Sequence, residues 1–565
     1  MKKYLLILAA ITLAGHTDIR EVFVSPVDIP VSLSANFGEL RPDHFHSGVD
    51  IKTNGVTGKN ILSASDGYVY RIVVSPSGFG RALYIRHEGG ISTVYGHLDS
   101  FIPEINEYVK DQQYSKKSFS VDLYPPADKF RFRKGELIAL SGNSGSSQGP
   151  HLHYEVRRSS NENPVDPLKY LDVKDDIRPT IDRIIVYPAS RQSAVNGYHE
   201  KVRFTLTGDK GKYTLSSPSP VLVSGEIGFA VSTWDYINNS WNKCGVRSVE
   251  MKLDGETRYR HSLDEFAFSE SRYINSHIDY AEQVSSRAYF QKTYIDPNNK
   301  MSIYDHFDTK GIISLVDNDL HKVELIVTDY AGNNSKVSFL IASGDINNTL
   351  SEESNVTRVI PFASNAEFNR HDIRLSFPEN CFYDTLFFVY KKSPSQAGLL
   401  SDIHYVHDRF TPVHKSFEIA IKPFDTDPGI YEKLCLVYIS DQSVSYSGGS
   451  FSEGFVKGSV RNLGNYAVGA DTIPPVLRPV NFSEGADIRG RNNIRIFIDD
   501  DFSGIASYNV KIDGNWTLFE WDPKNRSLSC TSDPSRIKQG TDHQLEAIAM
   551  DNKGNSTTLN MKFKW

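Results

Sequence analysis

Short runs in which apolar and polar residues alternate, each closed by a glycine or an Asp-Gly turn, dominate the first part of the chain. They occupy residues 61–70, 81–86, 91–95 and 135–140. Alternation with a period of two, bounded by turn residues, is typical of β-strands, whereas a helix needs a period of 3.6. A helical pattern is nearly absent between residues 22 and 170. This part of the sequence therefore predicts an antiparallel β-sheet domain.

The rest of the chain extends this expectation. Its 565 residues exceed the roughly 100 to 200 residues of one ordinary domain, so we expect several domains. Aromatic residues make up 12%, which suits strands whose flat rings pack on pleated surfaces. The formal charge is −7, with 62 Lys and Arg against 69 Asp and Glu, so the basic excess of a nucleic-acid-binding protein is missing. We predict a globular, mainly β protein without a nucleic-acid partner.

An internal repeat divides the second half. Residues 249–255 match residues 508–514, and residues 321–333 match residues 543–555. Each copy reads as a strand with an Asp-Gly turn, followed by two strands joined by an Asp-x-x-Gly-Asn turn. The first copy carries about 37 extra residues, which we place around residues 258–300. The repeat predicts two immunoglobulin-like β-sandwiches.

Proline-rich, acidic seams give the boundaries between domains. They lie at residues 163–167, 175–179 and 471–475. Between the two repeats, alternating runs favour a third β-sandwich. The predicted division is an N-terminal segment (1–15), an antiparallel β-sheet domain (16–173), an immunoglobulin-like sandwich with an insertion (174–345), a β-sandwich (346–470) and an immunoglobulin-like sandwich (471–565).

The N-terminus has the pattern of a secretory signal peptide. Two lysines follow Met1, and an apolar run covers residues 4–15, which is too short to span a bilayer of about 30 Å. Cleavage near Ala14 or Gly15 releases an exported chain, and retention of the segment as an anchor is the alternative. No later stretch of apolar residues is long enough for a transmembrane helix. We expect a periplasmic or wall-associated protein.

The four cysteines form no CxxC pair, so their spacing excludes a zinc ribbon or a thioredoxin-like site. Cys381 and Cys435 fall in the same predicted domain. A disulfide between them and buried free thiols are both compatible with the sequence.

Two histidine motifs in the first domain carry the candidate chemistry. His46 and Asp50 are four residues apart, and His151 and His153 are two apart on an alternating run. Residues i and i+2 of a strand point to one face, so the side chains of His151 and His153 can both reach one site. One of them, with His46 and Asp50, makes a three-ligand zinc site with an open position, and the other is a base beside it.

Further motifs strengthen this interpretation. Tyr95-Gly-His97-Leu98 and a Ser-Gly-Asn-Ser-Gly run at 141–145 precede Gly149-Pro150-His151. Together, these motifs resemble the LytM/lysostaphin type of zinc metallopeptidase, which cuts peptide bonds in the stems or bridges of bacterial peptidoglycan. The resemblance covers about 150 residues. It implies that His46, Asp50 and His153 bind Zn²⁺, and that His97 and His151 orient or deprotonate the attacking water and stabilise the oxyanion.

Three features depart from this pattern or leave it open. His44 forms a second His-x-His with His46, but only His46 has an aspartate four residues on. Residues 108–132 read as an inserted loop that narrows or covers the groove. Glu155 shares the strand face of His153, and it is either a residue that supports the ligand or a solvated carboxylate at the rim.

Competing motifs fail on their context. Gly145-x-Ser-x-Gly149 is followed by a strand, although a nucleophile elbow needs a helix, and no H-E-x-x-H motif occurs. The Asp499–Asp501 run and the Asp-x-x-Gly-Asn turns are interpreted as turn formers rather than Ca²⁺ ligands.

The sequence thus predicts an exported zinc endopeptidase that acts on peptidoglycan stems or cross-bridges, with β-domains that position it on the wall or on an envelope protein. The alternative is a non-catalytic envelope scaffold or an activator of wall amidases built on the same fold.

Overall fold

The computed structural model describes residues 23–217, 220–344, 355–441 and 443–565. The predicted signal peptide lies outside the described residues. Strands make up 46% of the structure and helices 8%, and most strand pairs are antiparallel, so the predicted mainly β fold is confirmed. No helix among the described residues combines the length and the apolar character that crossing a membrane requires.

The first unit (residues 23–173) is built on a sheet of 11 strands. Its main path runs through β1 (Leu33–Ala35), β2 (Val49–Lys52), β10 (His151–Arg158), β6 (Ile91–Phe101), β5 (Arg81–His87), β4 (Gly67–Val74) and β7 (Val121–Leu123). The short strands β3 (Asn60–Leu62), β8 (Arg131–Phe132), β9 (Leu137–Ser141) and β11 (Pro164–Val165) pair with these, and η1 (Glu88–Gly90) and η2 (Pro167–Lys169) are single turns.

Residues 108–132 do not form the expected loop. Helix α2 (Pro103–Lys116) begins with proline at its first position and buries Ile105, Val109 and Gln113 on one face, while β7 and β8 pair with β4. The i, i+4, i+8 spacing of these three residues is the helical signal, but it is weak because the third of them, Gln113, is polar. The hydrogen bonds and ion pairs of this segment reach β4 and the C-terminal part of the chain, not the histidine motifs.

The second unit (residues 174–344) contains a sheet of 12 strands. Its strands are β12 (Thr180–Pro188), β13 (Ala194–Val195), β14 (Val202–Asp209), β15 (Lys212–Leu215), β16 (Val221–Ser224), β17 (Glu226–Trp234), β18 (Ser248–Leu253), β19 (Glu256–Ser262), β20 (Gln291–Lys292), β21 (Ile313–Ser314), β22 (His321–Thr328) and β23 (Asn334–Ser343). The extra residues of the first repeat form η3 (Phe268–Tyr273), α3 (Ile274–His277) and α4 (Tyr280–Ser286).

The third unit (residues 355–470) has two sheets of five strands and one of two. Its strands are β24 (Arg358–Ile360), β25 (Ala366–Asn369), β26 (Ile373–Phe377), β27 (Leu386–Phe388), β28 (Tyr390–Ser393), β29 (Ile403–Val406), β30 (Phe417–Ile421), β31 (Leu434–Ser440), β32 (Ser443–Tyr446), β33 (Ser450–Ser452), β34 (Phe455–Val460) and β35 (Gly464–Ala470), with η4 (Pro428–Lys433). Cys381 and Cys435 are buried free thiols, so the structure has no disulfide between them.

The fourth unit (residues 471–565) has a sheet of four strands and one of five. Its strands are β36 (Val476–Pro479), β37 (Ala486–Asp487), β38 (Asn493–Asp499), β39 (Ile505–Ile512), β40 (Asn515–Trp516), β41 (Glu520–Asp522), β42 (Ser527–Thr531), β43 (Asp542–Asp551) and β44 (Ser556–Lys564).

The sequence repeat is also a structural repeat. Met251 of β18 pairs with Leu325 of β22, and the matching Val510 of β39 pairs with Ala547 of β43. In both copies a histidine Nδ1 lies 2.7 Å from the aspartate of the Asp-Gly turn. The two copies therefore share register and turn contacts as well as sequence.

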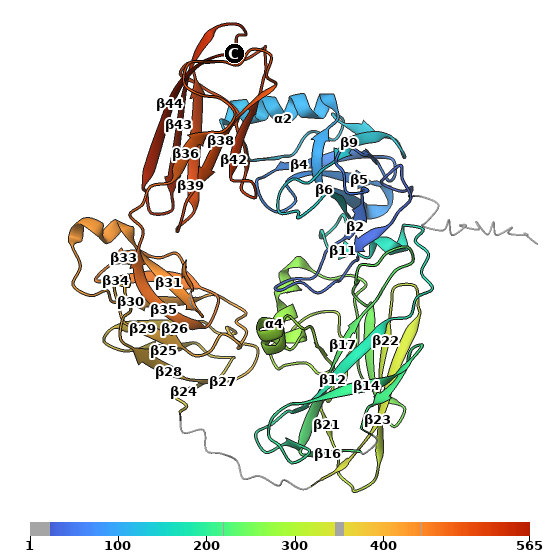
Figure 1. Cartoon of the computed structure of the whole chain (residues 1–565). Helices are drawn as coiled ribbons and strands as arrows, with labels where there is room; N and C mark the ends of the chain where they lie inside the picture. The colour runs from blue at the N-terminus through green and yellow to red at the C-terminus, as the bar shows by residue number, and fades with distance from the viewer. Residues whose placement is uncertain (1–22, 218–219, 345–354, 442) are drawn as a thin grey trace, which may run out of the picture.

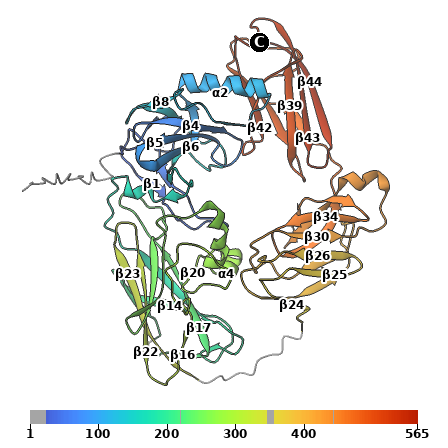
Figure 2. The same ribbon diagram turned by 180° about the vertical axis from the view of Figure 1, so that it is seen from behind.

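The four units form a closed ring (Figures 1 and 2). Phe45 of the first unit packs on Phe266 of the second, and Tyr273 of the second stacks on His414 of the third with ring centroids 4.2 Å apart. Lys553 of the fourth unit donates a hydrogen bond to a carbonyl of the third. The fourth unit returns to the first, where Trp516 packs on Tyr114 of α2.

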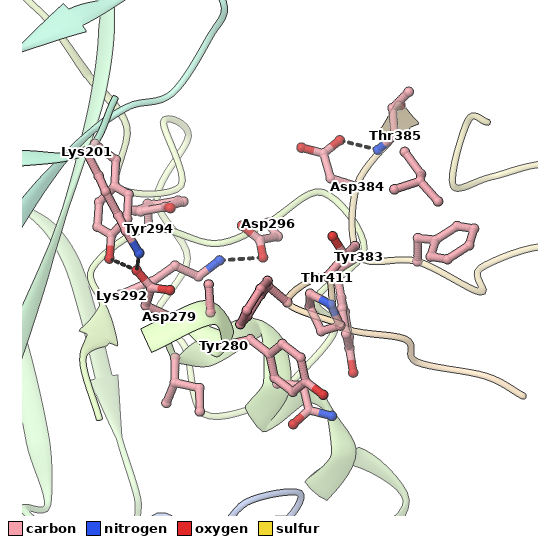
Figure 3. A pocket seen from close by; sticks show the side chains of 18 residues that line it. Lys201, Asp279, Tyr280, Lys292, Tyr294, Asp296, Tyr383, Asp384, Thr385 and Thr411 are labelled. Atoms are coloured by element: carbon pink, nitrogen blue, oxygen red, sulfur yellow. Dashed lines mark hydrogen bonds and ion pairs between the residues drawn. The ribbon is translucent and has the colours of Figure 1, made fainter. Parts of the chain in front are cut away.

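A cavity of about 290 Å³ lies between the second and third units (Figure 3). Its charged side chains pair with one another, because Lys201 Nζ lies 2.6 Å from Asp279 and Lys292 Nζ lies 2.6 Å from Asp296. The carboxylate of Asp384 accepts a hydrogen bond from the backbone N–H of Thr385. Each of these pairings lies within one unit, and none involves a residue of the histidine motifs.

Candidate metal centre

Three side chains of the first unit bring their donor atoms together. Asp50 lies on β2 and His153 on β10, and the two residues are direct partners in the antiparallel pairing of these strands. His46 lies in the segment that leads into β2. The Nε2 atom of His46 is 3.1 Å from Asp50 Oδ1 and 3.1 Å from His153 Nδ1, and the latter two atoms are 2.9 Å apart.

This triangle fits a tetrahedral metal ion. Zinc binds imidazole nitrogen and carboxylate oxygen at about 2.0–2.2 Å, which places neighbouring ligands on a tetrahedron about 3.3 Å apart. All three donor side chains are largely buried, with 9%, 14% and 4% of the side chains of His46, Asp50 and His153 exposed. Two nitrogens and one oxygen are the donor types that zinc accepts, and three protein ligands leave one position open.

Hydrogen bonds behind the donors hold them in the ligating orientation. The Nδ1–H of His46 donates to the carbonyl of Asn36 over 2.7 Å, which leaves Nε2 as the free donor atom. The other nitrogen of His153, Nε2, lies 3.0 Å from Glu155 Oε1. Glu155 is fully buried and also contacts Ser47 and Arg157, so it supports the ligand and does not lie at a solvated rim.

Charges around the triad favour a cation. Burial would raise the pKa of Asp50, but the charge of His46 and hydrogen bonds from His151 and His153 hold it well below its usual range. Burial would lower the pKa of His153, but its bonds to Asp50 and Glu155 raise it to about 9. The two carboxylates thus attract positive charge to the position between the donors.

Two further histidines stand beside the triad. The Nδ1 of His97 lies 2.9 Å from the carbonyl of Ser144, and the Nδ1 of His151 lies 2.8 Å from the carbonyl of Gly149. Since a carbonyl only accepts, both Nδ1 atoms carry a proton, which leaves the Nε2 of each ring for other contacts. The Nε2 of His151 lies 3.5 Å from Asp50 Oδ1, and the rings of His97 and His151 are 4.8 Å apart.

The backbone gives His97 its position. His97 has φ +60°, in the left-handed region, so its side chain leaves β6 at an angle that a regular strand does not allow. Burial lowers the pKa of His97 to about 3, and the positive charges of His153 and His151 lower it in the same direction. The imidazole is therefore neutral, with its proton on Nδ1.

The Ser-Gly-Asn-Ser-Gly run forms one wall beside these histidines. Ser144 Oγ donates to the carbonyl of Leu98 and accepts the N–H of Arg81. Gly145 has φ +67°, and a Cβ there would lie 2.3 Å from the backbone nitrogen of Gly80. Only glycine fits this close approach, which aims the Ser144 carbonyl at His97.

Two contributors to the site were not predicted from the sequence. Phe79 stacks on the ring of His153 with centroids 4.7 Å apart, and Asn36 holds His46 through its carbonyl. Neither belongs to a motif, and only the folded contacts show them. His44, the alternative ligand, pairs with Asp43 and leaves 57% of its side chain exposed, so the structure does not bring it to the triad.

The segment of His46 is also held from outside the first unit. The side-chain amide of Asn36 donates to the carbonyl of Gly245 and accepts its N–H, at 2.8 and 2.7 Å. Phe45 lies in a small core with Phe266 and Ile274 of the second unit. The second unit therefore forms part of the scaffold of the metal centre.

We expect Asn36→Ala to destabilise this junction, because the half-buried N–H and C=O of Gly245 lose their partners. Each unsatisfied buried group costs about 1–3 kcal/mol. The measurement is the midpoint of thermal unfolding, with Asn60→Ala as the control, since Asn60 bonds Asp28 at an exposed site. An equal midpoint for both variants would contradict the role given to Asn36.

Residues 44–114 match the model of Peptidase family M23, and this part of the first unit is an M23 (LytM-type) peptidase domain. The match includes His46, Asp50 and His97 and ends before His151. A second match, to the Zu5-like domain, covers residues 357–471.

Curated relatives are similar to the same domain. An uncharacterized metalloprotease of Haemophilus influenzae is 34% identical over 131 residues, which cover 23% of this chain and 21% of the relative. The DD-carboxypeptidase/endopeptidase Mpg of Neisseria meningitidis is 32% identical over 129 residues, which cover 23% of each. The chain thus spans about a fifth of the length of these relatives.

Among solved structures, the catalytic domain of lysostaphin from Staphylococcus simulans aligns with 24% of this chain and 90% of its own length. The identity is 21% and the TM-score 0.19.

Proposed function

We propose that this chain is an exported, zinc-dependent endopeptidase that hydrolyses peptide cross-links of bacterial peptidoglycan. The observation that carries the proposal is the meeting of His46, Asp50 and His153 beside His97 and His151, two histidines that carbonyl groups hold through Nδ1. Relatives named metalloprotease and DD-carboxypeptidase/endopeptidase support the same reaction class.

The roles follow from the geometry. His46, Asp50 and His153 would hold Zn²⁺, which supplies a Lewis acid and lowers the pKa of water that it binds to about 7. His97 accepts a proton at Nε2, because its Nδ1–H is committed to the Ser144 carbonyl. His151 is held in the same tautomer by Gly149, and it takes up or returns a proton at Nε2 during bond cleavage.

The remaining units fit a role in positioning. We propose that the protein works in the periplasm or at the cell wall after loss of residues 1–15. The second and fourth units would be immunoglobulin-like sandwiches, and the β units together would place the peptidase domain on the wall or on an envelope protein.

The first experiment is hydrolysis of purified cross-linked muropeptides by the mature chain from about residue 16, with zinc measured on the same sample. Conversion of cross-linked dimers to monomers together with stoichiometric zinc is the expected result, and the products identify the bond. Stoichiometric zinc without cleavage would favour a regulated enzyme or an amidase activator. If the sample contains no zinc and does not cleave the substrate, the chain is better interpreted as an envelope scaffold.

We expect Glu155→Gln to weaken zinc binding. The amide can still contact His153, but it no longer attracts the positive charge that a metal-bound imidazole carries. Loss of such a supporting carboxylate costs about 10- to 100-fold in metal affinity or activity. Competition with a chromogenic chelator measures the affinity, and Glu162→Gln is a control, since Glu162 lies near the same Arg157 but does not contact His153. An unchanged zinc affinity in Glu155→Gln would show that this carboxylate does not support the ligand.

A further inference from the structure

Three aspartates of the second unit meet where the chain enters it from the first unit. Asp175 precedes β12, Asp235 directly follows β17 and Asp329 directly follows β22. Each offers an oxygen, and these atoms all lie within 4.8 Å of one another. No residue of this cluster, here called the Asp175 triad, belongs to the peptidase site.

Two members of the triad are buried, and the third, Asp175, is half-buried. Asp235 is 1% exposed and Asp329 0%. Lys169 and Arg247 pair with Asp264, and Arg183 pairs with Asp182. Burial raises the pKa of Asp235 to about 8, and the charges of Asp175 and Asp329 raise it in the same direction. Three carboxylates this close repel one another unless a proton or a cation lies between them.

One oxygen of the triad has no partner at all. Asp235 Oδ1 is buried and accepts no hydrogen bond. By contrast, Asp329 accepts the N–H groups of Gly332 and Asn333, which is the turn role predicted from the sequence. The side chain of Asn333 also ties Asp329 to the carbonyl of Asp175, over 2.9 and 3.1 Å. Hydrogen bonds therefore hold two of the three aspartates in place beside the unsatisfied acceptor, Asp235 Oδ1.

The fourth unit repeats this arrangement. Asp471, Asp500 and Asp551 form a second cluster of the same size, again at the entry to the unit. Asn555 ties Asp551 to the carbonyl of Asp471, over 2.7 and 3.0 Å, as Asn333 does in the second unit. Asp500 Oδ1, at the position of Asp235, is also buried without a partner. The same unsatisfied acceptor in both copies indicates a shared requirement rather than a local accident of packing.

We propose that the Asp175 triad is a binding site for a calcium ion. Its donors are all oxygens, and carboxylate and carbonyl oxygens suit Ca²⁺, whereas zinc sites in proteins usually include nitrogen or sulfur. A divalent cation there neutralises the mutual repulsion and gives Asp235 Oδ1 its partner. The ion also fixes the strand ends of β17 and β22 to the segment that links the first and second units.

The site lies a short chain of bonds from the metal centre of the first unit. Asp235 and Cys244 exchange backbone hydrogen bonds of 2.9 Å, and the next residue, Gly245, is held by the side chain of Asn36. The carbonyl of Asn36 accepts the Nδ1–H of His46. Calcium in the second unit thus stiffens the support of a zinc ligand without touching the zinc site.

The test is a calcium titration of the full mature chain, freed of metals on a chelating resin and reloaded with one equivalent of zinc. Isothermal titration calorimetry counts the bound ions, and thermal unfolding measures the stabilisation. The variant is Asp235→Asn. The control is Asp305→Asn in the same unit, since Asp305 pairs with Arg260 at the surface.

We expect the wild type to bind calcium with Kd between about 10⁻⁶ and 10⁻³ M. Saturating calcium should raise its unfolding midpoint by roughly 5 °C. Asp235→Asn should bind one ion fewer per chain, whereas Asp305→Asn should behave as the wild type. Without calcium, Asp235→Asn should unfold no earlier than the wild type, because it loses a repulsive charge, so a folded variant is available for the comparison.

Two results would overturn the proposal: no calcium uptake by the wild type at 10 mM, a concentration about tenfold above the weakest expected Kd, or an equal number of ions bound by the wild type and Asp235→Asn. Neither readout involves hydrolysis, so the outcome is independent of the proposed peptidase activity.

Discussion

His153→Ala is expected to abolish hydrolysis of cross-linked muropeptides and to remove stoichiometric zinc. His153 supplies one of three donor atoms, and its loss leaves two ligands and removes one of the contacts of the buried Glu155. The Lewis acid supplies several kcal/mol of transition-state stabilisation, so the rate should fall by at least about 10³-fold. Product analysis by chromatography and zinc content by mass spectrometry are measured on the same preparation.

The matched control is His44→Ala. His44 lies two residues from His46 and forms the same His-x-His spacing, but it is exposed and pairs with Asp43. This variant should keep both zinc and activity. If His44→Ala lost zinc while His153→Ala kept it, the ligand set would be wrong.

His97→Asn is expected to lower the rate of hydrolysis by about 10²- to 10⁴-fold with zinc still bound, because the chain loses a general base. Asparagine is chosen because it tolerates the left-handed backbone of this position, where alanine would add strain. The measurement is kcat on a defined cross-linked peptide, with zinc content as the internal reference.

The two variants separate two roles. Loss of activity with full zinc in His97→Asn, and loss of both in His153→Ala, would divide proton transfer from metal binding. Full activity in His97→Asn would exclude His97 as the base and leave that role to His151, whose Nε2 lies 3.5 Å from Asp50 Oδ1.

The sequence was informative where chemistry is local. The spacings of His46 with Asp50, and of His151 with His153, show which donors can share a face, and pairing of β2 with β10 sets Asp50 opposite His153. Period-two alternation also sufficed for the mainly β fold. These are short-range patterns, which a single chain displays without its tertiary contacts.

Features that depend on long-range packing were not accessible in this way. Asn36 and Phe79 act through a backbone carbonyl and a ring face, and neither leaves a pattern in the sequence. The sequence of helix α2 predicts a loop, because the helix has only one narrow buried face and one of its residues is polar. Glu155 was ambiguous because strand position gives the face of a side chain but not what covers it.

The fourth unit contacts the first unit close to the candidate metal centre. Lys524 donates hydrogen bonds to the carbonyls of Asn143 and Ser147, on either side of the glycine that aims Ser144 at His97, and Glu520 pairs with Arg81 next to the same wall. Residues almost 400 positions downstream thus support the loop beside His97 and His151. A first unit excised at residue 173 would lose these contacts. We therefore expect rate constants measured on the excised unit to differ from those of the full chain.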